Sequence, residues 1–280
     1  MKHFITYLLY VAFATLSAQP HSTTDWQLSN LQGKVKSVRA IPYEISNGKK
    51  GAVAQDINAA MKIANIENQL KEFNPKGFLT QTRFFHQNGD LYSRMEYYYT
   101  PEGQLFETRY NSDKTLYVYN PAGYLIKDVT YSPGGFLKNH YSYQLNDKGQ
   151  VLKEETYYYN QLESSVVYTY HKKGYAAETD YYNAEDQLQQ KVLTTVKGNP
   201  KTERSKTYNA NGKLMNITTK KYNSAGDCIS LQSDNKLPEK SKNVATYTYT
   251  YDPQGNWTSK TTFINGEARE IIERTFEYYE

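Results

Sequence analysis

The sequence predicts an all-β protein, an elongated antiparallel meander of about 17–18 strands built from repeated β-hairpins, with a coiled or strongly twisted sheet. Aromatic residues make up 15% of the chain and include 29 tyrosines, although the mean hydropathy is only −0.81. Disordered chains are poor in aromatics, and tyrosine and threonine favour strands. A glycine-centred motif recurs along the chain, often every 12 or 14 residues. This spacing leaves room for strands of about 8–10 residues between turns.

The first 18 residues have the pattern of a secretory signal peptide. Lys2 and His3 precede an apolar run over residues 4–16, and small residues follow up to Ala18, near which we expect cleavage. The run is shorter than the ~20 residues of a spanning helix. Cys228 is the only cysteine, so a lipid anchor at the mature N-terminus is not expected. We therefore expect an exported protein, periplasmic or extracellular, with no integral membrane segment in the mature chain.

Residues 19–280 are expected to form a single domain whose beginning, residues 19–66, differs from the rest. Residues 34–45 alternate in the manner of a first strand. The segment after them lacks the turn motif. Ile57, Ala60, Met61 and Ala64 follow helical spacing, which favours a short helix and leaves an ordered flap or a loop as alternatives.

The repeat occupies residues 67–280 and reads aromatic, small polar residue, two residues, glycine, any residue, apolar residue. The polar residue can hydrogen-bond its own backbone two positions on, and proline at the next position presets φ for a type I turn. Glycine then supplies the left-handed residue that closes the turn with a bulge. Ten copies carry the glycine: Gly77, Gly89, Gly103, Gly123, Gly135, Gly149, Gly174, Gly212, Gly226 and Gly255. Two degenerate copies place Lys114 and Asp186 at that position.

This turn also predicts the register of each hairpin. If Thr100 pairs with Gln104, then Tyr99 faces Leu105, and the same count pairs Tyr222 with Cys228. Such aromatic–apolar pairs contribute on the order of 0.2–1 kcal/mol each. The clearest structural positions of the repeat are Tyr99, Gly103, Leu105, Tyr119, Gly123, Leu125, Tyr251, Gly255 and Trp257. We expect their side chains to form the thin core of the sheet.

The motif resembles the YD repeat of the Rhs and teneurin families, whose signature is Tyr-x-Tyr-Asp-x-x-Gly. "YTYDPQGNW" at residues 249–257 is the best copy, and "YVYNPAGYL" and "YTYHKKGYA" are looser ones. The resemblance covers most of the chain from Phe73 onward, and the exported, tyrosine-rich form looks like YD-like proteins of Bacteroidota-type bacteria. It implies a hairpin-repeat architecture and an association with carbohydrate binding. The chain is too short for the large toxin shells of long arrays. "YNANGKL" and "FHQNGDL" are also similar to MORN-type variant repeats, which act as binding surfaces.

Candidate binding residues are the tyrosines outside the motif positions. Tyr98, Phe106 and Tyr158 are expected to face away from the Leu105 side, where an exposed aromatic row would mark an interaction site. Sugar rings stack on aromatic faces, and tyrosine adds a hydroxyl group. The alternative to a ligand-binding role is that such a tyrosine packs within the core of a thin sheet.

The sequence contains no convincing reaction chemistry. The histidines are scattered, no spacing typical of metal ligands occurs, and Cys228 is expected to be a buried apolar residue of the motif. A formal net charge of +4 is too small to indicate a nucleic-acid partner. We expect no cofactor, no metal and no enzymatic activity. The expected function is that of an exported binding or structural module for a glycan or a cell-surface protein, with a protein scaffold or adhesin as the alternative and a glycosidase-like enzyme as the less favoured one.

Overall fold

The computed structural model describes residues 23–54 and 68–280. Within these residues the chain forms one short helix, α1 (Asp25–Leu28), and nineteen strands in antiparallel pairs. The strands are β1 (Val35–Ser46), β2 (Lys49–Val53), β3 (Gln69–Phe73), β4 (Leu79–Phe85), β5 (Leu91–Tyr99), β6 (Leu105–Tyr110), β7 (Asp113–Tyr119), β8 (Leu125–Tyr131), β9 (Leu137–Leu145), β10 (Val151–Tyr158), β11 (Gln161–Tyr170), β12 (Ala176–Asn183), β13 (Leu188–Lys197), β14 (Thr202–Asn209), β15 (Leu214–Tyr222), β16 (Cys228–Asn235), β17 (Ser241–Tyr251), β18 (Trp257–Ile264) and β19 (Glu267–Tyr278). The predicted signal peptide and the predicted helix around Ile57 lie outside the described residues.

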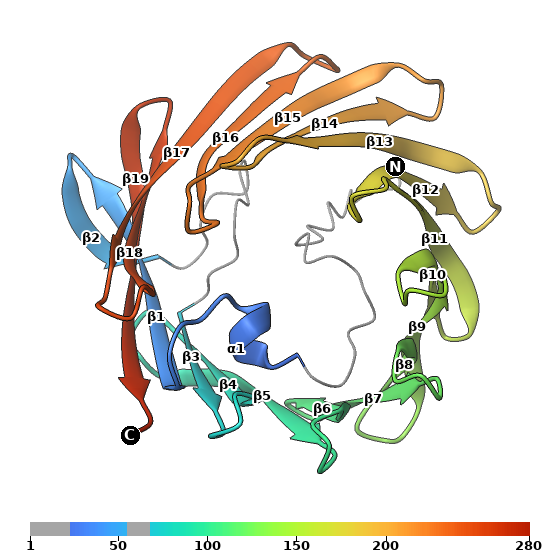
Figure 1. Ribbon diagram of the computed structural model, residues 1–280, viewed down its shortest axis with the longest axis horizontal. Helices are drawn as coiled ribbons and strands as arrows, with labels where there is room; N and C mark the ends of the chain where they lie inside the picture. Colours follow the sequence, from blue (N-terminus) through green and yellow to red (C-terminus); the bar gives the residue numbers. More distant parts are fainter. Residues whose placement is uncertain (1–22, 55–67) are drawn as a thin grey trace.

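The sheet closes into a barrel (Figure 1). The last strand, β19, pairs with β1 along most of its length, and residues 37–40 of β1 pair with β3 on the other side. Each strand from β3 to β19 pairs with the next one, so the ring contains eighteen of the nineteen strands. The remaining strand, β2, pairs with the end of β1.

The prediction of an elongated, open meander is therefore wrong. Each strand of a sheet is rotated against its neighbour with a constant hand. In this chain the rotation brings the last strand back to the first, and pairing the two edges removes their unsatisfied backbone groups.

The hairpin register agrees with the one predicted from the turn motif. Thr100 N–H donates to the Gln104 carbonyl at 2.8 Å, and Tyr99 lies opposite Leu105 across a bulge. The same arrangement pairs Tyr222 with Cys228. All ten motif glycines have positive φ, between +73° and +94°, the region that favours glycine.

The degenerate copies differ from each other. Asp186 occupies the glycine position with a φ of +58°, as the motif predicts. Lys114 does not, because β6 and β7 are joined by a tighter turn at Asn111 and Ser112. Lys114 instead pairs with Arg109 inside the sheet. Asparagine tolerates the left-handed region, with a φ of +53° at Asn111, so the shorter turn is accessible there.

Helix α1 lies inside the ring (Figure 1) and identifies its inner wall. Asp25 accepts hydrogen bonds from Leu79 N–H at 2.8 Å and from the Tyr99 hydroxyl at 2.9 Å. Trp26 donates to the Val35 carbonyl at 2.8 Å. The buried apolar cluster beneath the helix contains Leu31, Val35, Val38, Phe73 and Leu79. Since successive side chains alternate between faces, these contacts place Tyr99 and Tyr97 on the inner wall, and the same alternation turns the motif tyrosines Tyr131 and Tyr182, at the opposite rim, to the other face.

Candidate functional site

The three residues predicted to bind a ligand lie on the outer wall or at a rim. The Tyr98 and Phe106 rings lie 6.5 Å apart, which agrees with a shared face. Tyr158 is 50% exposed and packs on Tyr159 at the end of β10, four strands further around the ring. The structure thus brings two of the three together.

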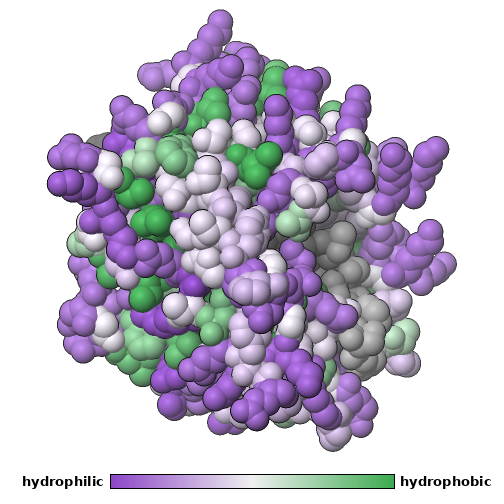
Figure 2. Space-filling view, turned by 60° about the vertical axis from the view of Figure 1, so that its left-hand side comes forward, coloured by the Kyte–Doolittle hydropathy of each residue, from purple (hydrophilic) through white to green (hydrophobic). Residues whose placement is uncertain are grey.

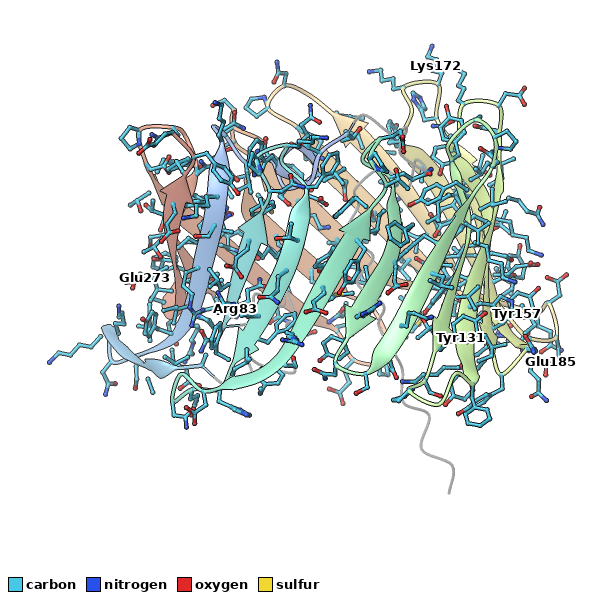
Figure 3. The ribbon with its side chains drawn as sticks, turned by 90° about the horizontal axis from the view of Figure 1, so that it is seen from below. Arg83, Tyr131, Tyr157, Lys172, Glu185 and Glu273 are labelled. Atoms are coloured by element: carbon cyan, nitrogen blue, oxygen red, sulfur yellow. The ribbon has the colours of Figure 1, made fainter. Side chains whose placement is uncertain are left out.

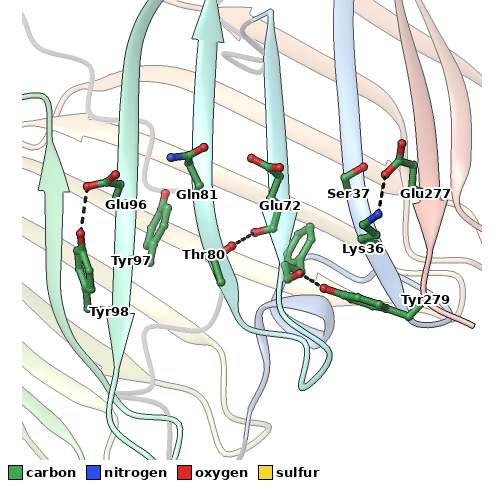
Figure 4. Close-up of a pocket in the computed structure, with 11 residues that line it drawn as sticks. Lys36, Ser37, Glu72, Thr80, Gln81, Glu96, Tyr97, Tyr98, Glu277 and Tyr279 are labelled. Atoms are coloured by element: carbon green, nitrogen blue, oxygen red, sulfur yellow. Dashed lines mark hydrogen bonds and ion pairs between the residues drawn. The ribbon is translucent and has the colours of Figure 1, made fainter.

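Tyr98 lines an open groove of about 530 Å³ on the outer wall (Figure 4). The groove crosses β19, β1, β3, β4 and β5. Its three carboxylates are all engaged. Glu72 pairs with Arg83 at 3.1 Å, Glu277 pairs with Lys36 at 3.6 Å, and Glu96 accepts from the Tyr98 hydroxyl at 3.0 Å. The groove therefore offers a surface whose charges are already satisfied.

The inner wall gathers two carboxylates among tyrosines, in what we call the acidic patch: Asp128, Glu154, Tyr117, Tyr141, Tyr143, Tyr168 and Tyr181. Asp128 stands between Tyr117 and Tyr141 on the neighbouring strands. Glu154 stands opposite Tyr143. The Tyr143 hydroxyl donates to Asp128 at 2.8 Å. The two carboxylates are separated by β9 and by an offset of two residues along the strands, which places their backbone positions about 12 Å apart.

Burial is the largest cause of the pKa shifts of the two carboxylates in the acidic patch. It raises the pKa of Asp128 to about 6, although the hydrogen bond from Tyr143 opposes the shift. Burial also raises the pKa of Glu154, and the charge of Asp128 adds to that effect. Among the described residues no Lys or Arg forms an ion pair with either carboxylate. Two acidic groups held without a cation are costly to bury, which is typical of functional positions.

The opposite part of the inner wall carries cations, in what we call the basic patch: Lys71, Lys260 and Arg274 on β3, β18 and β19 (Figure 1). All three are half-buried, and burial lowers the pKa of each. Arg274 lies over the Trp257 ring at 4.0 Å, and Lys260 lies over the Tyr247 ring at 4.6 Å. The inner wall thus carries carboxylates without a cation over β8–β10, and over β3, β18 and β19 it carries these three cations together with one carboxylate, Glu270, whose charge opposes the fall in the pKa of Lys260.

The residues predicted as structural also lie on or beside this inner wall. The Tyr119 hydroxyl donates to the Leu105 carbonyl at 2.6 Å. Tyr251 and Trp257 are directly opposite in the register, but the Trp257 ring contacts Tyr249, and the Tyr251 hydroxyl donates to Asp227 at 2.7 Å. Leu125 lies opposite Tyr119, and Gly103, Gly123 and Gly255 occupy the turns.

Sequence reasoning missed both patches, because it assigned the motif face to a dry core. Lys71 shares strand parity with Phe73, and Asp128, Glu154 and Lys260 lie opposite Tyr117, Tyr143 and Tyr249, which share parity with motif residues on their own strands. That polar content on the expected core side was the available signal. A thin sheet core has no room for four ionisable groups, whereas the inside of a wide barrel does.

The outer wall carries ion pairs that run between and along neighbouring strands. Figure 3 shows the side chains on this wall, with Arg83 labelled. Arg83 pairs with Glu72, and Lys153 pairs with Glu155 at 2.8 Å. Lys191 contacts Glu178 and Asp180 on β12. The side that bears β1, β2 and β19 is mainly hydrophilic, with scattered apolar patches (Figure 2).

In the described part of the chain, no group of three or more His, Cys, Asp or Glu residues is arranged to hold a metal ion. No helix among residues 23–54 and 68–280 has the length and apolar content needed to cross a membrane.

Comparison with known proteins gives only distant matches. No family model matches the sequence, and no curated protein matches it. A porin-like protein from Bacteroides uniformis is 14% identical with a TM-score of 0.46, and the match covers 88% of this chain and 98% of that one. The TcdB2-TccC3-TEV structure is 13% identical with a TM-score of 0.25, and TcdB2-TccC3 without its hypervariable C-terminal region is 14% identical with a TM-score of 0.21. This chain spans 19% and 14% of the length of those two. Matches at this level carry no argument about function, and the YD-repeat likeness stays a resemblance.

Proposed function

We propose that this protein is an exported, non-catalytic β-barrel that binds saccharide-class ligands at the acidic patch of its inner wall. One observation supports this function above others. Asp128 and Glu154 are held without a cation among five tyrosines on a single concave face.

The chemistry of the patch suits a ligand rich in hydroxyl groups. Carboxylate oxygens accept hydrogen bonds from sugar hydroxyls, and such charge-assisted bonds are stronger than neutral ones. Tyrosine rings offer faces against which sugar rings pack, and their hydroxyls act as donors or acceptors. Ligand sites are commonly concave and combine aromatic surface with a few fixed polar groups.

The charged side chains of the outer wall favour a barrel whose outside is surrounded by water and not by lipid. A barrel that spans a membrane presents an apolar band about 25 Å tall to the lipid, and charged side chains on that band are destabilising. Here the outer wall carries ion pairs such as Arg83–Glu72 and Lys153–Glu155. Together with the predicted signal peptide, this favours the periplasm or the cell exterior.

The test compares an inner-wall variant with a matched outer-wall variant. The purified protein is titrated with neutral cello-, malto- and chito-oligosaccharides by isothermal calorimetry. We expect at least one class to bind. The double change Asp128→Asn and Glu154→Gln should weaken that binding by at least about tenfold, since hydrogen bonds to charged groups contribute about 1.5–3 kcal/mol. Glu155→Gln, on the outer wall of the same strand, should leave the affinity unchanged.

Three outcomes would contradict the proposal. Absence of binding to all classes, or equal losses in the inner-wall and outer-wall variants, would favour a protein scaffold or adhesin that uses the outer wall. Hydrolysis of the bound oligosaccharide would replace binding with catalysis by the two carboxylates.

A further inference from the structure

A second pocket, of about 210 Å³, lies at the rim of the barrel next to the chain that follows α1. Its walls come from Ser29, Asn30 and Gln32, from the β15–β16 and β17–β18 turns, and from Trp257 and Arg274 on the last two strands. It belongs to the basic side of the inner wall, on strands remote from the acidic patch.

The pocket is held in shape by hydrogen bonds that join distant parts of the chain. Asn256, only 3% exposed, accepts from Gln32 N–H at 2.8 Å and donates to the Gln32 carbonyl and the Tyr278 hydroxyl, each at 2.8 Å. Asn30 donates to the Ala225 carbonyl at 3.3 Å. A pocket whose walls are fixed in this way loses little entropy when it is occupied.

Arg274 brings unused hydrogen-bond donors to this pocket. Its guanidinium stacks against Trp257 at 4.0 Å and Phe276 at 4.8 Å, and no described residue forms a hydrogen bond or an ion pair with it. The Asp252 carboxylate is bonded by Tyr278 and by Asn256 N–H instead. Burial lowers the pKa of Arg274 to about 10, so the group stays charged at neutral pH. A planar guanidinium with free N–H groups matches the two oxygens of a carboxylate.

Asp227 supplies the negative charge and the hydrogen-bond acceptor of the pocket. Its carboxylate accepts from the Tyr251 hydroxyl at 2.7 Å and lines the same cavity as Arg274 without forming an ion pair with it. One fixed negative charge beside one fixed positive charge disfavours a dianion and favours a monoanion that also has hydrogen-bond donors.

We propose that this rim pocket binds a small carboxylic acid that carries hydroxyl groups, with Arg274 holding the carboxylate and Asp227 accepting from a hydroxyl. The size of the cavity limits the ligand to roughly one sugar acid or hydroxy acid. The pocket shares no residue with the acidic patch. A failure of saccharide binding at the acidic patch would therefore leave the proposal for this pocket unaffected, and the reverse also holds.

The experiment measures binding of glucuronate to the purified protein by isothermal calorimetry, with glucose, glucose 6-phosphate and alanine as comparison ligands. Glucuronate should bind at least tenfold more tightly than glucose and glucose 6-phosphate. Alanine, which has a carboxylate but no hydroxyl group, distinguishes an amino acid from a hydroxylated acid, and tighter binding of alanine would overturn the choice of a hydroxylated acid.

Variants separate the pocket from the rest of the barrel. Arg274→Met should reduce glucuronate affinity at least tenfold, and Arg274→Lys should retain the fold and part of the affinity. Arg269→Met, at an exposed arginine near the start of the same strand, should change nothing. The Asp128→Asn and Glu154→Gln double variant should keep full glucuronate binding. Equal affinities for glucuronate and glucose, or unchanged glucuronate binding in both folded Arg274 variants, would overturn the proposal.

Discussion

The turn glycines of this barrel serve two purposes that can be separated at single residues. At Gly149 a Cβ atom would lie 2.3 Å from the Tyr124 ring, and at Gly103 it would lie 2.4 Å from Phe78. In both cases the aromatic residue belongs to the preceding hairpin on the same rim. At Gly212 the φ of +73° is the same as at Gly149, but nothing lies within 4 Å. The repeat therefore uses glycine for backbone conformation everywhere and for packing between hairpins at selected turns.

This difference predicts unequal costs for the same substitution. Gly212→Ala should destabilise the protein by about 1 kcal/mol, the cost of an L-residue in the left-handed region. Gly149→Ala should cost about 1–3 kcal/mol more, because Tyr124 must also move. Urea unfolding followed by circular dichroism measures both. Equal midpoints for the two variants would show that the Tyr124 contact does not contribute.

Asp128 makes stability depend on pH in a direction opposite to that of most carboxylates. Its pKa of about 6 lies above the ordinary value of 3.8, so the folded state holds this proton more tightly than the unfolded chain does. The stability gained from the proton is present below about pH 4 and is lost as the pH rises through 6. At neutral pH the folded protein must bury a charge.

Asp128→Asn should therefore stabilise the protein at pH 7.5 by about 1–3 kcal/mol and have little effect near pH 4. The asparagine oxygen can still accept from Tyr143. Unfolding midpoints of the variant and the parent across this pH range test the expectation. Asp147→Asn, at an exposed turn position, should follow the parent at every pH. A variant that loses stability at pH 7.5 would mean that the charged form is favoured in the fold.

At the scale of elements, α1 packs against the inner wall near one rim of the barrel, although it has only four residues. Its Thr24 cap and Gln27 form a reciprocal capping box, which satisfies backbone groups that so short a helix leaves open. Trp26 covers Gly77 and packs near Phe73, with ring centroids 6.5 Å apart. Since isolated helices of this length are unstable, the barrel must provide most of its stability.

Trp26→Ala should cost about 2–4 kcal/mol, because it removes a large, half-buried ring that packs on the core cluster, together with its hydrogen bond to Val35. Leu28→Ala, two residues further along the same helix and 49% exposed in the parent, should cost less than about 0.5 kcal/mol. Thermal unfolding gives both values. Similar losses in the two variants would mean that the helix contributes through its backbone and not through Trp26.

The hairpins are the elements that the sequence predicts best. Asn120, Pro121 and Gly123 lie within five positions of each other, and their local conformational preferences are sufficient to set the turn and the pairing of Tyr119 with Leu125. Helix α1 was not predicted. Its stabilising partners, Tyr99 and Val35, are supplied by other elements, so the segment around Asp25 carries too little periodic signal to be recognised.

At the scale of the whole molecule, closure depends on one seam between the two ends of the chain. Ser37 lies opposite Glu277, and Arg39 lies opposite Thr275. In an open meander of this many strands the same residues would be separated by roughly 80 Å, at ~4.8 Å per strand. Closure therefore brings together residues that a local analysis of the sequence places at opposite ends.

A disulfide across the seam tests closure directly. With Cys228→Ser as background, Ser37→Cys and Glu277→Cys should form an intramolecular disulfide on mild oxidation, because paired Cα atoms lie within its required range. Non-reducing electrophoresis at several protein concentrations detects it. Ser37→Cys combined with Ser142→Cys on β9 should give no intramolecular bond. A cross-link in the second pair but not in the first would contradict the closed ring.

The sequence by itself determined the hairpins, their register and the two faces of each strand, because these follow from interactions between residues a few positions apart. Only the tertiary structure decided that β19 meets β1, since that contact depends on twist accumulated over eighteen strands. Closure also decided which face is enclosed. Motif tyrosines such as Tyr99 and Tyr119 became part of the wall of an interior that contains Asp128 and Arg274, while Tyr98 and Phe106 were left outside. The alternating residue pattern of each strand indicates that its two faces differ. The direction in which the whole sheet curves determines which face is enclosed and can hold a ligand.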